Sequence, residues 1–233
     1  MSVTITDLPH LVRQLTPHIA TDDTLPSIHG IYLEATGTHL FAAATDRYTF
    51  ALTRREATEA AAPWKAFIAR TDLTALRALF PTRNRPAALF LTYTAPKAVD
   101  RSDARLAVGD GTRSLSLSAH TPLAAKFPAW RPLFADALAA EPRQDTEACY
   151  NADFLARWAK AAHRYQPLTT WSAGPGKPLL IAAGPDFLGL QMPVRAAEHK
   201  SGTPARERHD RAALRSTWTD TLTAAPGRRL KAA

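Results

Sequence analysis

The order of elements along this chain constrains its fold most strongly, because the same order recurs three times. The first copy begins with a strand at 2–6 and continues with a helix whose apolar residues recur at three- and four-residue spacing from Leu8 to Ile19. Three strands follow, at 27–35, 39–45 and 48–55. This order is typical of a helix packed on one face of a small antiparallel sheet.

Two further copies repeat the order. The second has a strand at 64–69, a helix at 73–80, and strands at 87–94, 105–108 and 114–120. The third has a strand at 147–150, a helix that Asn151 caps, and strands at 169–173, 179–183 and 187–192. Each copy is about 50–60 residues long, the length of one supersecondary unit rather than of a whole domain.

A unit of this kind cannot bury both faces of its own sheet, so it needs a partner unit. The first two copies can pair into one complete domain, whereas the third has no partner copy in the sequence. Its open helix side or sheet edge must then be covered by the tail, by the first domain or by a second copy of the protein. The predicted fold class is therefore α+β, with one complete domain and one half domain.

The charge of the chain indicates a polyanionic partner, because the net value is +8 over 233 residues. Half of that excess lies at 196–233, a segment that contains eight basic and four acidic side chains. Leu214, Trp218 and Leu222 recur there at four-residue spacing and predict a short amphipathic helix. This basic tail either covers the third unit or forms a mobile arm that holds DNA or another protein.

No motif in the sequence predicts catalysis, a metal or a cofactor. A Gly-rich phosphate loop, a His-Glu-x-x-His pair and a nucleophile elbow are all missing from the sequence. Cys149 with His163 is the one conceivable nucleophile and base, and we expect Cys149 to be an ordinary strand residue. The apolar runs are too short to span a bilayer and no secretion signal follows Met1, so we expect a cytoplasmic protein without membrane contact.

Three short motifs resemble those of the bacterial sliding clamp, the beta subunit of DNA polymerase III. They are Thr-Asp-Arg-Tyr-Thr-Phe-Ala at 45–51, Phe-Pro-Ala-Trp-Arg at 127–131 and Met-Pro-Val-Arg at 192–195. Arg47 stands where the family usually has glycine, and Phe50 where it usually has leucine. The motifs follow one another in the family's order, and the likeness, which covers about four-fifths of the chain, implies a DNA-clamp-like fold.

The resemblance also implies how the chain is divided. Residues 1–134 correspond to the family's middle domain and 147–197 to the second half of its last domain, with a linker at 135–146 and a basic tail at 198–233. The family's first domain and the first half of its last domain have no counterpart in this sequence. We expect a homo-oligomer, because four such chains would be needed to close a ring of the family's size, or two chains could share a domain built from their third units.

In the family, these three motifs form a pocket for partner peptides. By this resemblance the pocket is lined by Ile28, Thr45, Arg47, Tyr48, Phe50, Pro128, Leu133, Leu190, Met192, Pro193, Val194 and Arg195. A concave apolar patch with a methionine, prolines and aromatic rings suits a short peptide that offers Leu and Phe anchors. The expected partners are DNA polymerase or other proteins with a clamp-binding motif. The alternative is that these residues only join two packing units.

Basic side chains on the predicted helices suggest a second contact, with the phosphates of duplex DNA and without sequence specificity. They are His10, Arg13, Arg77, Arg157, Lys160 and Arg164, and a solvated helix face explains them equally well. We therefore expect a clamp-like replication or repair accessory protein that binds rather than catalyses. The alternative is a regulatory protein that binds or inhibits replisome components through the pocket or the basic tail without forming a ring.

Overall fold

The computed structural model describes residues 1–57, 62–81, 88–96, 104–143, 148–163, 165–194 and 214–219. Met1–Pro193 form one compact body and Val194–Ala233 form a second. In the second body, the described residues 214–219 are helical, and Leu222 of the predicted tail helix lies outside the described ranges. Membrane-spanning helices are absent from the described part of the chain.

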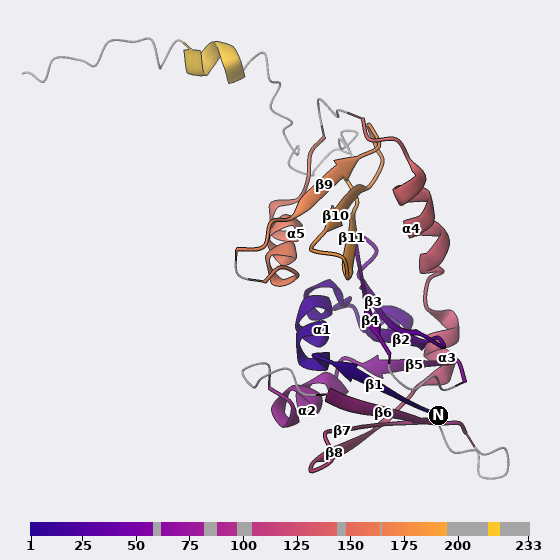
Figure 1. The fold of residues 1–233 in the computed structure, drawn as a ribbon. Helices are drawn as coiled ribbons and strands as arrows, with labels where there is room; N and C mark the ends of the chain where they lie inside the picture. Colours follow the sequence, from indigo (N-terminus) through magenta and orange to yellow (C-terminus); the bar gives the residue numbers. More distant parts are fainter. Residues whose placement is uncertain are drawn as a thin grey trace, which may run out of the picture. The chain divides into compact units, whose positions relative to one another are not determined.

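The body formed by Met1–Pro193 contains two antiparallel sheets (Figure 1). The four-stranded sheet has the order β1 (Ser2–Thr6), β6 (Ala88–Thr94), β7 (Arg105–Gly109) and β8 (Ser114–Ser118). The seven-stranded sheet has the order β5 (Trp64–Ala69), β2 (Gly30–Ala35), β3 (His39–Thr45), β4 (Thr49–Glu56), β11 (Phe187–Gln191), β10 (Leu179–Ala182) and β9 (Thr169–Ser172). The predicted strands therefore agree with the observed ones to within a few residues, with one exception described below.

The first two of the three repeated units exchange their first strands, and the sequence alone did not indicate this exchange. β1 belongs to the first unit in sequence but pairs with β6 of the second, with Ile5 opposite Leu89. β5 belongs to the second unit but pairs with β2 of the first, with Ile68 opposite Ile31. Each sheet is thus completed by a strand from the other unit, which explains why one unit alone cannot form a finished domain.

The third unit joins the first through its last strand. β11 pairs with β4, so that Leu190 lies opposite Phe50, and this pairing extends the sheet of the first unit by three strands. The predicted strand at 147–150 is wrong over residues 148–150, which are not in a strand. In the complete domain the equivalent strand pairs with the sheet of a partner unit, and the described chain offers no such sheet to residues 148–150.

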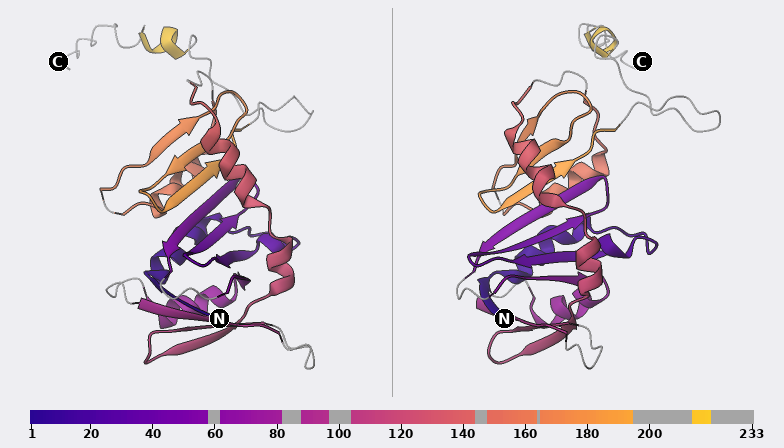
Figure 2. Two further views of the ribbon diagram at one scale, coloured as in Figure 1. Left: turned by 45° about the vertical axis from the view of Figure 1, so that its right-hand side comes forward. Right: turned by 90° about the vertical axis from the view of Figure 1, so that its right-hand side faces the viewer.

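Helices cover both faces of the seven-stranded sheet (Figure 2). On one side lie α1 (Leu8–Leu15) and α5 (Ala152–Arg157), with α2 (Asp72–Leu79) on the same side of the molecule. On the other side lie α3 (Thr121–Lys126) and α4 (Trp130–Ala139). Short 3-10 helices at Thr16–His18, Pro26–Ile28 and Trp158–Lys160 complete the described elements. Two buried apolar clusters result, and alternate residues of the central strands belong to one or the other.

Helix α4 is the largest departure from the sequence-based expectation. Residues 135–139, expected as the start of a linker, continue a ten-residue helix that begins at Trp130. Trp130 and Phe134 lie one helical turn apart and are both buried in the same cluster as Phe50. Burial of these two large rings, together with the alanine-rich sequence, stabilises helix where only a spacer was expected.

Candidate functional site

The turn between β3 and β4 is held by its own side chains. The Asp46 carboxylate accepts the backbone N–H groups of Tyr48 and Thr49 at 3.0 and 2.7 Å. The Thr45 hydroxyl donates to the Thr49 carbonyl at 2.8 Å. Arg47, at the tip, has a φ of 77°, in the left-handed region that favours glycine. The aspartate thus fixes an Asx-type turn even though an arginine occupies the strained position.

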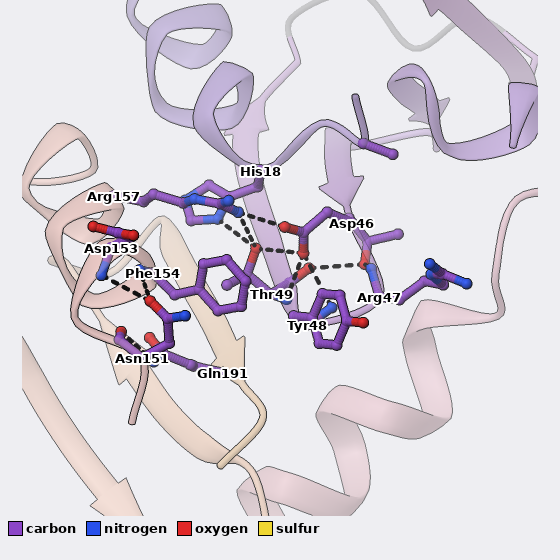
Figure 3. A network of polar contacts seen from close by, with 12 residues as sticks. His18, Asp46, Arg47, Tyr48, Thr49, Asn151, Asp153, Phe154, Arg157 and Gln191 are labelled. Atoms are coloured by element: carbon purple, nitrogen blue, oxygen red, sulfur yellow. Dashed lines mark hydrogen bonds and ion pairs between the residues drawn. The ribbon is translucent and has the colours of Figure 1, made fainter. Parts of the chain in front are cut away.

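A helix of the third unit anchors this turn (Figure 3). Arg157 of α5 donates from Nη1 to the Asp46 carboxylate and, at 3.3 Å, to the Thr49 hydroxyl. The Arg157 and Asp46 side chains are only 27% and 12% exposed. Burial alone would raise the pKa of Asp46, but the hydrogen bonds from Arg157 and Thr49 outweigh burial and hold that pKa below its usual value. The turn and the third unit are therefore fixed to each other by a shielded ion pair.

Trp158, the next residue along, fills the space between the third unit's helix and the sheet. Its indole Nε1 donates to Gln191 Oε1 at 2.6 Å, and its ring centroid lies 4.2 Å from that of His18. A Cβ on Gly189 would lie 2.2 Å from the indole Cζ3, so this strand position requires glycine. Trp158 is 1% exposed, and it packs the third unit onto the first.

An exposed apolar patch lies beside this buried junction and consists of Tyr48, Phe154 and Met192; we call it the junction patch. The Met192 N–H donates to the Tyr48 carbonyl at 2.9 Å, which continues the β4–β11 pairing past the strand ends. The Tyr48 and Phe154 rings stack with centroids 5.6 Å apart. Tyr48 is 53% and Met192 36% exposed, and the Arg47 guanidinium carbon lies 6.0 Å from the Tyr48 ring. Two rings, a flexible thioether and a cation form a surface that suits an apolar peptide side chain.

Three residues of the predicted pocket lie in the core instead. Ile28, Phe50 and Leu190 are 5%, 7% and 6% exposed. Phe50 makes edge-on contacts with Phe127 and Phe134, with centroids 5.8 and 5.5 Å apart. Because Phe134 comes from α4, the helix that replaces the expected linker covers this face of the sheet and shields these side chains from solvent.

A separate groove, which we call the α4 groove, lies between α4 and strands β9 and β10. Its volume is about 620 Å³. Its apolar lining comes from Leu133, Ala137, Trp171, Pro178 and Leu180, and its charged lining from Asp136, Glu141, Arg143 and Lys177. Leu133 and Trp171 are 47% and 39% exposed. Of these residues only Leu133 was predicted from the sequence to line a binding pocket. The apolar spacing of α4, from Trp130 through Leu133 and Phe134 to Ala137, was the signal that could have found the groove.

The other predicted pocket residues are divided between surface and interior. Thr45 is buried, Pro128 is exposed and Pro193 is half-buried. Val194 begins the second compact body, and Arg195 lies outside the described residues. The structure therefore brings Thr45, Arg47, Tyr48, Phe50, Leu190 and Met192 together at the β4–β11 junction, and it places Leu133 in the α4 groove.

The predicted DNA contacts also fall into two groups. Arg77 and Lys160 are exposed and Arg13 is half-buried. His10 is 6% exposed and stacks on His163 with centroids 4.1 Å apart, and Arg157 is occupied by Asp46. Arg164 lies outside the described residues. The helices that carry Arg13, Arg77 and Lys160 nevertheless share one side of the molecule (Figure 1).

Ligands for a metal do not gather in the described ranges, since no three His, Cys, Asp or Glu side chains come together there. A polar cavity of about 370 Å³ lies beside the stacked histidines and is lined by Asp7, His10, Gln14, Arg55, His163 and Asp186, among others. Arg55 donates to Gln14 at 3.0 Å, and Gln14 donates to the Ala161 carbonyl at 2.7 Å. These contacts link the first unit to the third on the helix side.

Comparisons with known proteins identify the fold. Models of known protein families do not match the chain, and neither do curated protein sequences. Among solved structures, the DNA polymerase sliding clamp from Pseudomonas aeruginosa with ligand is 12% identical, with a TM-score of 0.63, over 84% of this chain and 66% of that one. The DNA polymerase III beta subunit from Thermotoga maritima is 13% identical, with a TM-score of 0.62, over 84% and 66%. The Helicobacter pylori beta clamp bound to DNA ligase peptide is 13% identical, with a TM-score of 0.57, over 86% and 68%.

The chain spans about two thirds of the length of these solved clamps. The protein thus has the fold of the bacterial sliding clamp, the beta subunit of DNA polymerase III, over about two thirds of such a clamp chain.

Proposed function

We propose that this protein is a sliding-clamp-like accessory factor of DNA replication or repair, which acts by binding partner peptides and not by catalysis. The observation that carries the proposal is the exposed junction patch, because it lies where the third unit joins the complete clamp domain. The solved Helicobacter pylori clamp is described as bound to a DNA ligase peptide, and a peptide ligand is inferred for this chain by analogy of fold.

Two exposed surfaces could hold the apolar anchors of such a peptide. The junction patch offers Tyr48 and Met192, and the α4 groove offers Leu133 and Trp171. A few buried anchor side chains supply most of the binding energy of a peptide interface, so one charge placed in the occupied surface should weaken binding strongly. The core position of Phe50 and Leu190 favours binding at the surface over binding in a deep pocket between the first and third units.

Binding of a fluorescently labelled peptide with Leu and Phe anchors, followed by anisotropy, tests this proposal. Met192→Asp should weaken binding at least tenfold if the peptide occupies the junction patch, and Leu133→Asp should do so if it occupies the α4 groove. Leu138→Asp is the matched control, because Leu138 is 58% exposed on the same helix but does not line the α4 groove. Equal affinities for wild type and both test variants would contradict the proposal.

Non-specific contact with duplex DNA is the second part of the proposed function. Arg13, Arg77 and Lys160 are carried by helices on one side of the molecule, which supports contact with phosphates rather than bases. The affinity for duplex DNA should fall steeply with salt, and Arg77→Glu with Lys160→Glu should reduce both affinity and salt dependence. Lys126→Glu, an exposed residue of α3 on the opposite side, is the control.

Retention on DNA of different topology separates a tethering ring from a regulator that does not encircle DNA. A closed ring stays on circular duplex DNA at high salt and slides off after linearisation, whereas a protein held only by phosphate contacts dissociates from both. Equal, salt-sensitive retention on both DNA forms would therefore favour the regulatory alternative.

A further inference from the structure

We infer that Arg47 selects partner peptides that carry a carboxylate beside their apolar anchor. In the complex, the anchor lies on the junction patch, and the carboxylate pairs with the Arg47 guanidinium at the edge of that patch. The inference rests on the proposed peptide binding and names the chemistry of the peptide that this chain prefers.

The backbone at Arg47 has a conformation that arginine disfavours. Its φ of 77° lies in the left-handed region, where a Cβ is crowded by a carbonyl oxygen and glycine is the usual residue. Disfavoured conformations of this kind persist where the surrounding structure enforces them, and they cluster at active sites and ligand-binding sites. An arginine kept at such a position needs a reason other than backbone preference.

The Arg47 side chain does not hold the turn together. The Thr45 hydroxyl oxygen accepts the Arg47 N–H at 3.1 Å, and the Asp46 carboxylate accepts the two N–H groups that follow. Arg157 fixes that carboxylate from helix α5. Glycine at position 47 would keep all of these contacts, so the arginine side chain is available for another role.

The charge of Arg47 is not neutralised within the described part of the chain. The side chain is exposed, and no ion pair between described residues includes it. Hydrogen bonds from Thr24, at 2.6 and 2.9 Å, chiefly lower the pKa of Asp22, and the charge of Arg47 contributes only weakly. Asp46, the neighbouring acid in sequence, is already paired with Arg157. A positive charge is thus left at the edge of the junction patch.

The surface beside this charge is apolar, which distinguishes it from a phosphate-binding surface. The Arg47 guanidinium carbon lies 6.0 Å from the centroid of the Tyr48 ring, and that ring stacks with Phe154 at 5.6 Å. Non-specific contact with duplex DNA relies instead on several cations placed along the phosphates. Arg157 also reaches this turn, but its charge is already paired. One cation beside two aromatic rings fits an apolar side chain that has an acidic neighbour.

The charges around the junction patch also give the bound peptide a direction. Arg47 lies on the Tyr48 side of the stacked rings, whereas Asp153, which is exposed, lies on the Phe154 side (Figure 3). A carboxylate on the peptide is therefore attracted at one end of the patch and repelled at the other. We expect the acidic residue to strengthen binding on one side of the anchor only.

A charge-exchange experiment on the full chain tests the inference. The probe is the labelled peptide with Leu and Phe anchors, made with one Asp or one Asn directly before or directly after the anchors, and followed by anisotropy. At one of these two positions, the Asp peptide should bind wild type about threefold to tenfold more tightly than the Asn peptide, as expected for a partly exposed ion pair. Arg47→Gln, which keeps the Cβ and hence the backbone strain, should remove this preference. Arg47→Glu should reverse it, and Arg47→Lys should restore part of it.

Lys126→Gln is the matched control, because it removes an exposed positive charge from α3 and should leave the preference for Asp unchanged. A preference that Lys126→Gln reduces as much as Arg47→Gln does would reflect the overall charge of the chain and would overturn the inference.

The remaining outcomes separate this inference from the proposed function. Equal affinities of wild type for the Asp and Asn peptides at both positions would overturn the role of Arg47 and leave peptide binding intact. Failure of wild type to bind any of the peptides would overturn both. If Arg47→Gln weakened binding to duplex DNA and left the preference for Asp unchanged, the charge would serve phosphate contact, and the inference would be wrong.

Discussion

Arg157 donates a hydrogen bond to the carboxylate of Asp46, across 111 residues of sequence. The pair is partly buried and joins the third unit to the β3–β4 turn, so its loss leaves a shielded carboxylate without its cation. Arg157→Met should lower the free energy of unfolding by about 1–3 kcal/mol in urea titrations. Lys160→Met, an exposed residue one turn away, should change it by less than about 0.5 kcal/mol.

The same pair allows a double-mutant test. Asp46→Asn combined with Arg157→Met should cost less than the two single changes added together, because each single change leaves one partner unsatisfied. Strict additivity would mean that the two side chains do not stabilise each other.

Two buried histidines predict a loss of stability on acidification. Burial lowers the pKa of His10 to about 4, helped by the positive charges of Arg13 and Arg55 and by the adjacent His163. Burial, followed by the charge of Arg157, lowers the pKa of His18 to about 3.

Both histidines bind protons in the unfolded chain near pH 6.5 but stay neutral in the fold, so stability is present above that pH and is lost as the pH falls toward 4. Each contributes a slope of roughly 1.4 kcal/mol per pH unit in this range. Urea titrations between pH 7 and 4.5 should show a shallower slope for His10→Gln than for wild type, and identical slopes would contradict this account.

The left-handed backbone at Arg47 predicts a stabilising substitution. A non-glycine residue in this region costs roughly 1 kcal/mol, so Arg47→Gly should raise the free energy of unfolding by about that amount. Thermal unfolding followed by circular dichroism measures the change. If peptide binding weakens in the same variant, Arg47 is retained for its charge beside Tyr48 in spite of the backbone strain.

The close approach of Trp158 to Gly189 predicts the opposite effect. Gly189→Ala places a methyl group 2.2 Å from the indole, and the fully buried ring has little room to move. The change should cost about 1–3 kcal/mol of stability. In a Trp158→Leu background the added cost of Gly189→Ala should shrink, because the ring atoms that clash are gone; an unchanged cost would place the strain elsewhere.

Much of the fold could be predicted from the sequence, because the repeated order of elements is a local signal. The helices at 8–15 and 72–79 and nearly all strands follow from the spacing of apolar residues. The exchange of β1 and β5 could not be predicted, since the choice of a strand's partner depends on residues far away in sequence. The missing strand at 148–150 has the same cause: an extended segment becomes a strand only beside a free edge.

The candidate site was predicted in part. The motifs at 45–51 and 192–195 correctly indicated that Tyr48 and Met192 lie together, because both adjoin strands that pair. The burial of Phe50 was not predicted, since it depends on α4, which was interpreted as a linker. Arg157 was expected to contact DNA phosphates, with a solvated helix face as the alternative, and nothing local to its helix indicates the carboxylate of Asp46 that binds it.

Strand β8 carries a further consequence for assembly. It ends the four-stranded sheet, and its sequence Ser-Leu-Ser-Leu-Ser has no charge and no proline to discourage a neighbour. An uncharged edge strand can accept a strand from another chain more readily than an edge that carries lysine or proline, so this end of the four-stranded sheet is the place where a single added charge would most discourage edge-to-edge association.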